Sequence, residues 1–181
     1  MFDTLFSPDQ FLTVTTTTQK IDQILSDQKT LNYMRYTIGQ LEGSTGGTSQ
    51  MMYTRLGYHA CSHYAVNVLC GLNQKIIDSR KRARKMNFDY DITLSDLLEL
   101  WIQQQGRCAV TGVVMSFESG DLQNKNAYAC SVDRRDNEQG YTVDNVRLLT
   151  HWANNAKSTW PDYMFEVMIT EIVNNRKTSV V

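Results

Sequence analysis

The most constraining feature of the sequence is a pair of short apolar runs separated by a polar segment. The first run, Tyr128–Val132, ends in the charged sequence Asp-Arg-Arg-Asp, and the second run covers Val146–Leu149. A Gly-Tyr pair turns the chain back between them, since glycine favours turns. A polar, helix-length segment, His151–Lys157, follows at once. This order predicts two short strands followed by a short helix.

Helical periodicity dominates the chain before this stretch. Apolar residues recur at three- and four-residue steps over residues 62–86, and Thr93 or Ser95 begins a second helix with a stop near Gly106. The segment Thr13–Thr18 is β-branched and polar, which indicates an edge strand or an ordered arm. The N-terminal half is therefore expected to be mostly helical.

The sequence pattern changes after Gly106. Residues 107–112 and 115–126 are predicted to form short strands joined by polar loops, and Pro161 suits the first turn of a last helix. That helix is expected to bury an apolar stripe made of Met164, Phe165, Met168, Ile169, Ile172 and Val173. We therefore predict an α+β fold. Its expected parts are an N-terminal arm or lobe (1–50), a helical region with a basic end (51–106) and a C-terminal core (107–181).

The composition excludes several classes of protein. With 10 glycines and 2 prolines in 181 residues, collagen and low-complexity disorder are ruled out. No stretch approaches the roughly 18 uninterrupted apolar residues that a membrane helix needs, and the first ten residues do not resemble a signal peptide. The four cysteines form no C-x-x-C pair and are expected to be free thiols. We expect a cytoplasmic protein with no membrane partner.

The charge of the chain is unevenly distributed. The formal net charge is −1, yet residues 70–86 contain six bases and one acid. Such a basic segment is able to bind phosphates through Coulomb attraction and counterion release. It is also typical of a solvated helix face. Its candidate DNA-binding residues are Arg80, Lys81, Arg82, Arg84 and Lys85.

The predicted strand–turn–strand–helix segment contains groups that suit a metal ion. Asp133 comes at the end of the first strand, and the short helix presents Asn154 and Asn155. A hard divalent cation prefers oxygen ligands, and Mg²⁺ in particular is usually held by one or two protein groups, water and a substrate phosphate. Asp133 and Asn154 are therefore the candidate metal ligands.

The pattern D-R-x-D-x-x-x-G-Y-x-x-x-N-V with a downstream N-x-x-K-S resembles the HNH nucleases, also called His-Me finger or ββα-metal endonucleases. The resemblance is closest to small phage and homing-type members and to a rare-cutting restriction enzyme with Arg and Tyr in its active site. It is strong over Tyr128–Ser158 and weak upstream. It implies a ββα-metal finger that acts on DNA with Mg²⁺ or Mn²⁺.

The resemblance also assigns roles by position. Asp133 would be the carboxylate that binds the metal, and Asn154 the second ligand. Arg134 stands where most members have their general-base histidine, and Tyr141 where the tyrosine-bearing relative has its proposed nucleophile. Asn145 matches the Asn that ties the loop to the backbone.

The missing histidine leaves the source of the nucleophile open. Arg134 cannot act as a base because a guanidinium stays protonated, but it is able to hold the scissile phosphate. Tyr141 with a lowered pKa, His151 on the same helix face as Asn154, and water ionised by the metal are the three alternatives. Arg135 and Lys157 are further candidate phosphate contacts.

A second departure concerns zinc. Many relatives flank this unit with two Cys pairs, and the equivalent positions here are Cys108, Thr111, Thr150 and Ala153. One thiol of four does not build a tetrahedral zinc site, so no structural zinc is predicted. Apolar packing is expected to replace it, with Val110, Leu149 and Trp152 as contributors.

The expected function is that of a metal-dependent DNA endonuclease, with a homodimer left open. Two alternative functions remain open. A finger that has lost catalysis with its histidine would only bind nucleic acid. An interaction protein would dock onto a phage or host assembly through its N-terminal lobe.

Overall fold

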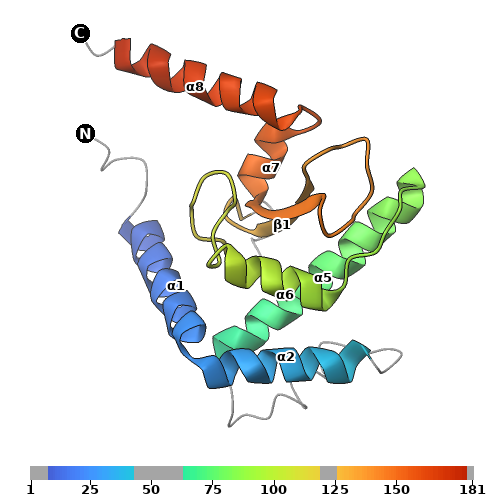
Figure 1. Ribbon diagram of the computed structural model, residues 1–181. Coiled ribbons are helices and arrows are strands. Elements are labelled where there is room, and N and C mark those ends of the chain that lie inside the picture. Colours follow the sequence, from blue (N-terminus) through green and yellow to red (C-terminus); the bar gives the residue numbers. More distant parts are fainter. Residues whose placement is uncertain (1–7, 43–62, 119–125, 179–181) are drawn as a thin grey trace.

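The computed structural model describes residues 8–42, 63–118 and 126–178. The expected boundary between the first two parts, at residue 50, lies outside these residues. The elements are, in chain order, α1 (Pro8–Ser26), α2 (Gln28–Glu42), α5 (His63–Met86), α6 (Leu94–Gln103), β1 (Cys130–Arg134), β2 (Val146–Thr150), α7 (His151–Lys157) and α8 (Asp162–Thr178). The protein is α+β, with helices before and after a small two-stranded sheet (Figure 1).

The two predicted helices of the central region are present with clear local signals. α5 covers His63–Met86, and Thr93 is the N-cap of α6 in a capping box with Asp96. α6 ends in a turn that leads to Gly106, whose φ of +66° lies in the left-handed region that favours glycine. A Cβ at this position would also come within 3.0 Å of Ile21 side-chain atoms.

The predicted hairpin is antiparallel and is followed directly by α7. In the register of the pair, Ser131 lies opposite Leu149, and Asp133 lies opposite Arg147. α7 packs on both strands. The strand–turn–strand–helix order predicted for this part of the chain is therefore observed.

The three strand predictions at 13–18, 107–112 and 115–126 are wrong for the residues that the structure describes; residues 119–125 lie outside them. Thr13–Thr18 lies within α1, which continues toward the buried residues Ile21 and Ile24, so the helical spacing of this region outweighs the β preference of threonine. Residues 107–118 contain no strand. Isolated bridges from Arg107 to Val114 and from Ser116 to Ala129 hold that segment as a tight loop.

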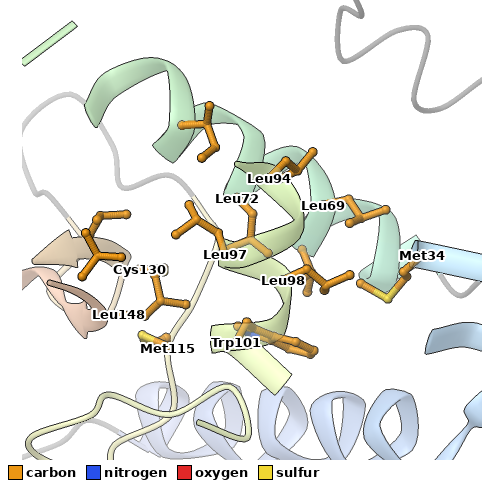
Figure 2. Close-up of a cluster of buried hydrophobic side chains, with 14 of the residues drawn as sticks. Met34, Leu69, Leu72, Leu94, Leu97, Leu98, Trp101, Met115, Cys130 and Leu148 are labelled. Atoms are coloured by element: carbon orange, nitrogen blue, oxygen red, sulfur yellow. The ribbon is translucent and has the colours of Figure 1, made fainter. Parts of the chain in front are cut away.

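The core lies where α6 is enclosed by α5, α2 and the hairpin. Trp101, Leu97 and Leu98 of α6 are fully buried, and Leu148 of β2 reaches the same cluster (Figure 2). This buried cluster extends from Ile21 in α1 to Ala153 in α7. The hairpin and α7 are thus fixed to the helical part through apolar contacts. Val110 and Trp152, expected to contribute to this packing, are more than one third exposed. For Trp152 the reason is that the buried side of α7 consists of Ala153 and Lys157.

The last helix does not match its predicted burial. Phe165 is 2% exposed, but the rest of the stripe, from Met168 to Val173, is 39–54% exposed. Figure 1 shows why, since α8 leaves the end of α7 and extends along the outside of the molecule. The expected buried stripe is therefore an open apolar face in the single chain.

Among the described residues, no helix combines the length and the apolar character that crossing a membrane requires.

Candidate functional site

The side chains of Asp133 and Asn154 lie on one face of the hairpin. Ser131 and Asp133 are two residues apart on β1, so they project to the same side of the sheet. Asn154 of α7 donates from Nδ2 to the Ser131 hydroxyl over 2.7 Å, and Lys157, one turn later, reaches Asp133. The structure therefore brings the two predicted ligands to the same layer between β1 and α7.

The Asp133 carboxylate is buried in an ion network that the sequence did not reveal. Arg147 donates from Nε to Oδ2 over 2.9 Å, and Lys157 donates from Nζ to Oδ1 over 3.3 Å. Arg147 also binds Asp162 of α8, and Lys157 lies 3.9 Å from the same carboxylate. Two cations and two anions balance, which allows them to be buried together.

This network corrects the role expected for Lys157. The side chain is fully buried, and its ammonium group also donates to the Arg134 carbonyl over 3.0 Å. A lysine in this position stabilises the Asp133 carboxylate and the end of β1. It is not available as a surface contact to phosphate.

The residues present fit a hard cation held by few protein groups. A carboxylate has about four acceptor positions, and hydrogen bonds from Arg147 and Lys157 to Asp133 use two of them. The 3.3 Å contact from Lys157 is the longer of the two, and Lys157 also donates to the Arg134 carbonyl over 3.0 Å. Asn154 carries an amide oxygen, which is a hard ligand type, and its side chain is positioned by the Nδ2 bond to Ser131. No group of three or more His, Cys, Asp or Glu side chains suited to a metal occurs in the described part of the chain.

Arg134 is held by its own loop. Its Nη1 donates to the carbonyls of Asn137 and Gln139, and its guanidinium lies over the Phe88 ring (4.3 Å) and the Tyr141 ring (5.1 Å). These contacts fix the guanidinium over Phe88 and Tyr141, on the side of β1 opposite to the Asp133 carboxylate, because neighbouring strand residues project to opposite faces. A planar guanidinium held in this way is pre-organised, with donors remaining for an incoming oxyanion.

Tyr141 is packed rather than presented to solvent. It is 5% exposed, its backbone N–H donates to the Asp89 carbonyl, and its ring lies against Tyr90. Gly140 makes this approach possible, because a Cβ there would be 2.2 Å from the Asp89 oxygen. The Gly-Tyr pair of the sequence motif therefore serves to dock the hairpin loop on the segment after α5.

Asn145 ties the hairpin loop to the backbone, as its place in the motif suggests. Its Nδ2 donates to the carbonyls of Asp136 and Gly140, and its Oδ1 accepts from the Asp136 N–H. The side chain is buried, so each of these bonds replaces water. The loop that follows Asp133 is held in one shape.

His151 and the zinc positions have local partners. His151 begins α7 and its Nε2 contacts the Asn155 side chain at 3.1 Å, on the exposed side of the helix. Thr150 donates its hydroxyl hydrogen to the buried Cys108 sulfur at 3.7 Å. Cys108 and Thr150 thus pack together at the junction of the hairpin and the loop before it.

The exposed bases at the end of α5 and in the hairpin loop are together called the basic face. It consists of Arg80, Lys81, Arg82, Arg84 and Lys85 of α5 with Arg135 of the loop, all exposed. Arg82 lies over the Tyr141 ring (5.9 Å), and Arg80 over the Tyr90 ring (5.2 Å). These stacking contacts place the α5 bases beside the loop that begins at Asp133.

Sequence reasoning missed Arg147 and Asp162. The available signal was an arginine inside an apolar strand, Val-Arg-Leu-Leu-Thr, since a buried charge requires a partner. The identity of the partner depends on the register of the hairpin. Asp162 belongs to another helix and gave no local signal.

No family model, no curated protein and no solved structure matches the chain in the comparisons with known proteins.

Proposed function

We propose that the protein is a metal-dependent DNA endonuclease of the ββα-metal type. The observation that carries the proposal is the common face of Asp133 and Asn154, with Asn145 holding the loop that follows Asp133. These are the residues of the HNH-like motif, and their side chains lie around one end of the hairpin.

The cation would be held by Asp133 and Asn154, and when bound it supplies Lewis-acid stabilisation of charge on the scissile phosphate. Arg134, held over Phe88 and Tyr141 on the other side of β1, adds a positive charge for the DNA backbone. The exposed bases of the basic face bind further backbone phosphates. Arg147 orients the Asp133 carboxylate through the hydrogen bond from its Nε to Oδ2.

The positions of Tyr141 and His151 bear on the identity of the nucleophile. Tyr141 is buried under Arg82 and Arg134, and the His151 ring contacts Asn155. A water nucleophile would require neither side chain to move. We therefore favour water over these two residues.

A second candidate function, DNA binding without cleavage, is supported by one specific observation. Both oxygens of Asp133 accept hydrogen bonds from positively charged side chains. These side chains neutralise the negative charge of the carboxylate, which would otherwise attract a metal ion. If the Lys157 contact does not open, the basic face remains as a binding surface only.

Cleavage of supercoiled plasmid separates the two functions. The wild type is expected to nick the plasmid with Mg²⁺ and not with excess EDTA. Asn154→Ala is expected to lower the rate at least 100-fold, whereas Asn155→Ala, on the exposed side of the same helix, leaves it within about twofold. Asn154 is preferred to Asp133 because Asp133→Ala would leave Arg147 and Lys157 buried without their partner. Wild-type protein that binds DNA without nicking it would overturn the nuclease proposal in favour of the binding function.

A further inference from the structure

The exposed side of α8 carries a continuous apolar face. Met168, Ile169, Ile172 and Val173 follow at three- and four-residue spacing, so they lie on one side of the helix. Their exposed fractions are 39–54%. Contiguous apolar surface of this kind is typical of a protein-protein interface rather than of a solvated helix.

Only the beginning of α8 is fixed to the rest of the described structure. Phe165 is buried, and Asp162 binds Arg147 at the base of the network described above. The remaining turns contain several Ile, Val, Thr and Asn residues, which are weaker helix formers than Ala, Leu or Met. Because most helix stability in proteins comes from packing of an apolar face, this arrangement calls for a partner.

The charges beside the face identify that partner as a second copy of the chain. Glu166 flanks the beginning of the face and Arg176 follows its end, and both are exposed. Ten residues of helix separate them by roughly 15 Å, so they cannot pair within one chain. In an antiparallel pair of α8 helices, Glu166 of each copy lies opposite Arg176 of the other. A parallel pair would place like charges together.

We infer that the protein forms a twofold symmetric dimer through antiparallel packing of α8 against α8 of a second chain. The same patch is used by both copies, as an isologous interface requires. The four apolar residues form its centre, and the two Glu166–Arg176 pairs close its ends. This inference does not depend on the proposed nuclease activity.

Sedimentation velocity of the full chain over a concentration series tests the dimer. The wild type is expected to approach twice the 20.8 kDa chain mass with rising concentration. Ile172→Glu is expected to raise the dimer dissociation constant at least 10-fold. Thr170→Glu, at an exposed position on another side of the same helix, serves as the matched control and is expected to change it less than threefold. A wild type that stays monomeric at every concentration overturns the inference and leaves the face to another protein or to residues outside the described ranges.

A charge-reversal cycle tests the antiparallel register. Glu166→Arg and Arg176→Glu, made singly, are each expected to raise the dissociation constant about fivefold or more, since like charges then meet at both ends. The double variant restores opposite charges between the copies and is expected to return to within about twofold of the wild type. Additive weakening in the double variant would rule out this pairing, because the two residues are too far apart to compensate within one chain.

Discussion

Arg147 and Asp133 occupy opposed positions on β2 and β1, and the Arg147 Nε donates to the Asp133 Oδ2 over 2.9 Å. Their side chains are 7% and 3% exposed, so the pair is a buried cross-strand ion pair. The same carboxylate is the candidate metal ligand. Stability of the hairpin and chemistry of the site therefore depend on one group.

Removal of Arg147 is expected to destabilise the protein strongly. Arg147→Leu leaves Asp133 with Lys157 alone, and breaking a buried pair costs about 3–5 kcal/mol of unfolding free energy. Urea denaturation measures this change. Arg35→Leu breaks the exposed Arg35–Glu99 pair and is the matched control, with an expected loss below about 1 kcal/mol. Equal losses for the two variants would show that burial of the hairpin pair has no energetic effect.

Asn145 is expected to control the order of the hairpin loop. Asn145→Ala removes three hydrogen bonds and leaves the buried Gly140 carbonyl without its side-chain donor, at a cost of about 1–3 kcal/mol. Hydrogen exchange of the 136–141 amides should accelerate, while that of α6 follows only the global loss. Unchanged exchange in this loop would contradict the assignment of Asn145 as its anchor.

The stability of the protein is expected to fall at alkaline pH, because a buried thiol and a buried phenol keep their protons in the folded state. Burial raises the pKa of Cys130 to about 12 and that of Tyr64 to about 12. In the unfolded chain the Cys130 thiol loses its proton near pH 9, whereas the folded protein keeps it, so the unfolded state binds fewer protons and stability decreases as pH rises from 9 toward 12.

Urea titrations at pH 8, 9 and 10 test this pH dependence. Each such proton contributes up to about 1.4 kcal/mol per pH unit. Cys130→Ala removes one of these titrating groups. The variant is expected to be less stable than the wild type at pH 8, but its unfolding free energy should decline less steeply as the pH rises. Parallel declines would show that Cys130 does not retain its proton.

The basic face is expected to provide most of the affinity for DNA. Lys81→Glu places an acid among the α5 bases and should weaken binding to a short duplex about 5–10-fold at roughly 100 mM salt, with a shallower salt dependence. Lys29→Glu makes the same charge change at an exposed position of α2, away from this face, and should change the affinity for DNA less than twofold. Fluorescence anisotropy measures both, and a similar loss for the two variants would indicate binding through net charge alone.

The parts of the fold that were predictable from the sequence are those with local signals. The spacing of apolar residues in α5, the capping box at Thr93 and the turn between the two strands depend on residues a few positions apart. The loop role of Asn145 was also predictable, because the motif contains both the residue and the turn that it holds.

The rest depended on contacts between distant segments. Asp133 meets Arg147 only because of the strand register, and it meets Lys157 only because α7 packs on β1. The exposure of α8 was likewise not readable from its apolar stripe, since periodicity shows which side of a helix needs a partner but not whether the same chain supplies it.

The most direct test of the account is the binding of Mn²⁺, followed by electron paramagnetic resonance, to the protein with a short DNA duplex. The wild-type complex is expected to take up Mn²⁺ beyond the amount that the duplex binds alone, and Asn154→Ala is expected to weaken this binding at least 10-fold, while Asn155→Ala leaves it unchanged. Equal uptake by the wild type and Asn154→Ala, or none above the duplex alone, would contradict a cation site shared by Asp133 and Asn154.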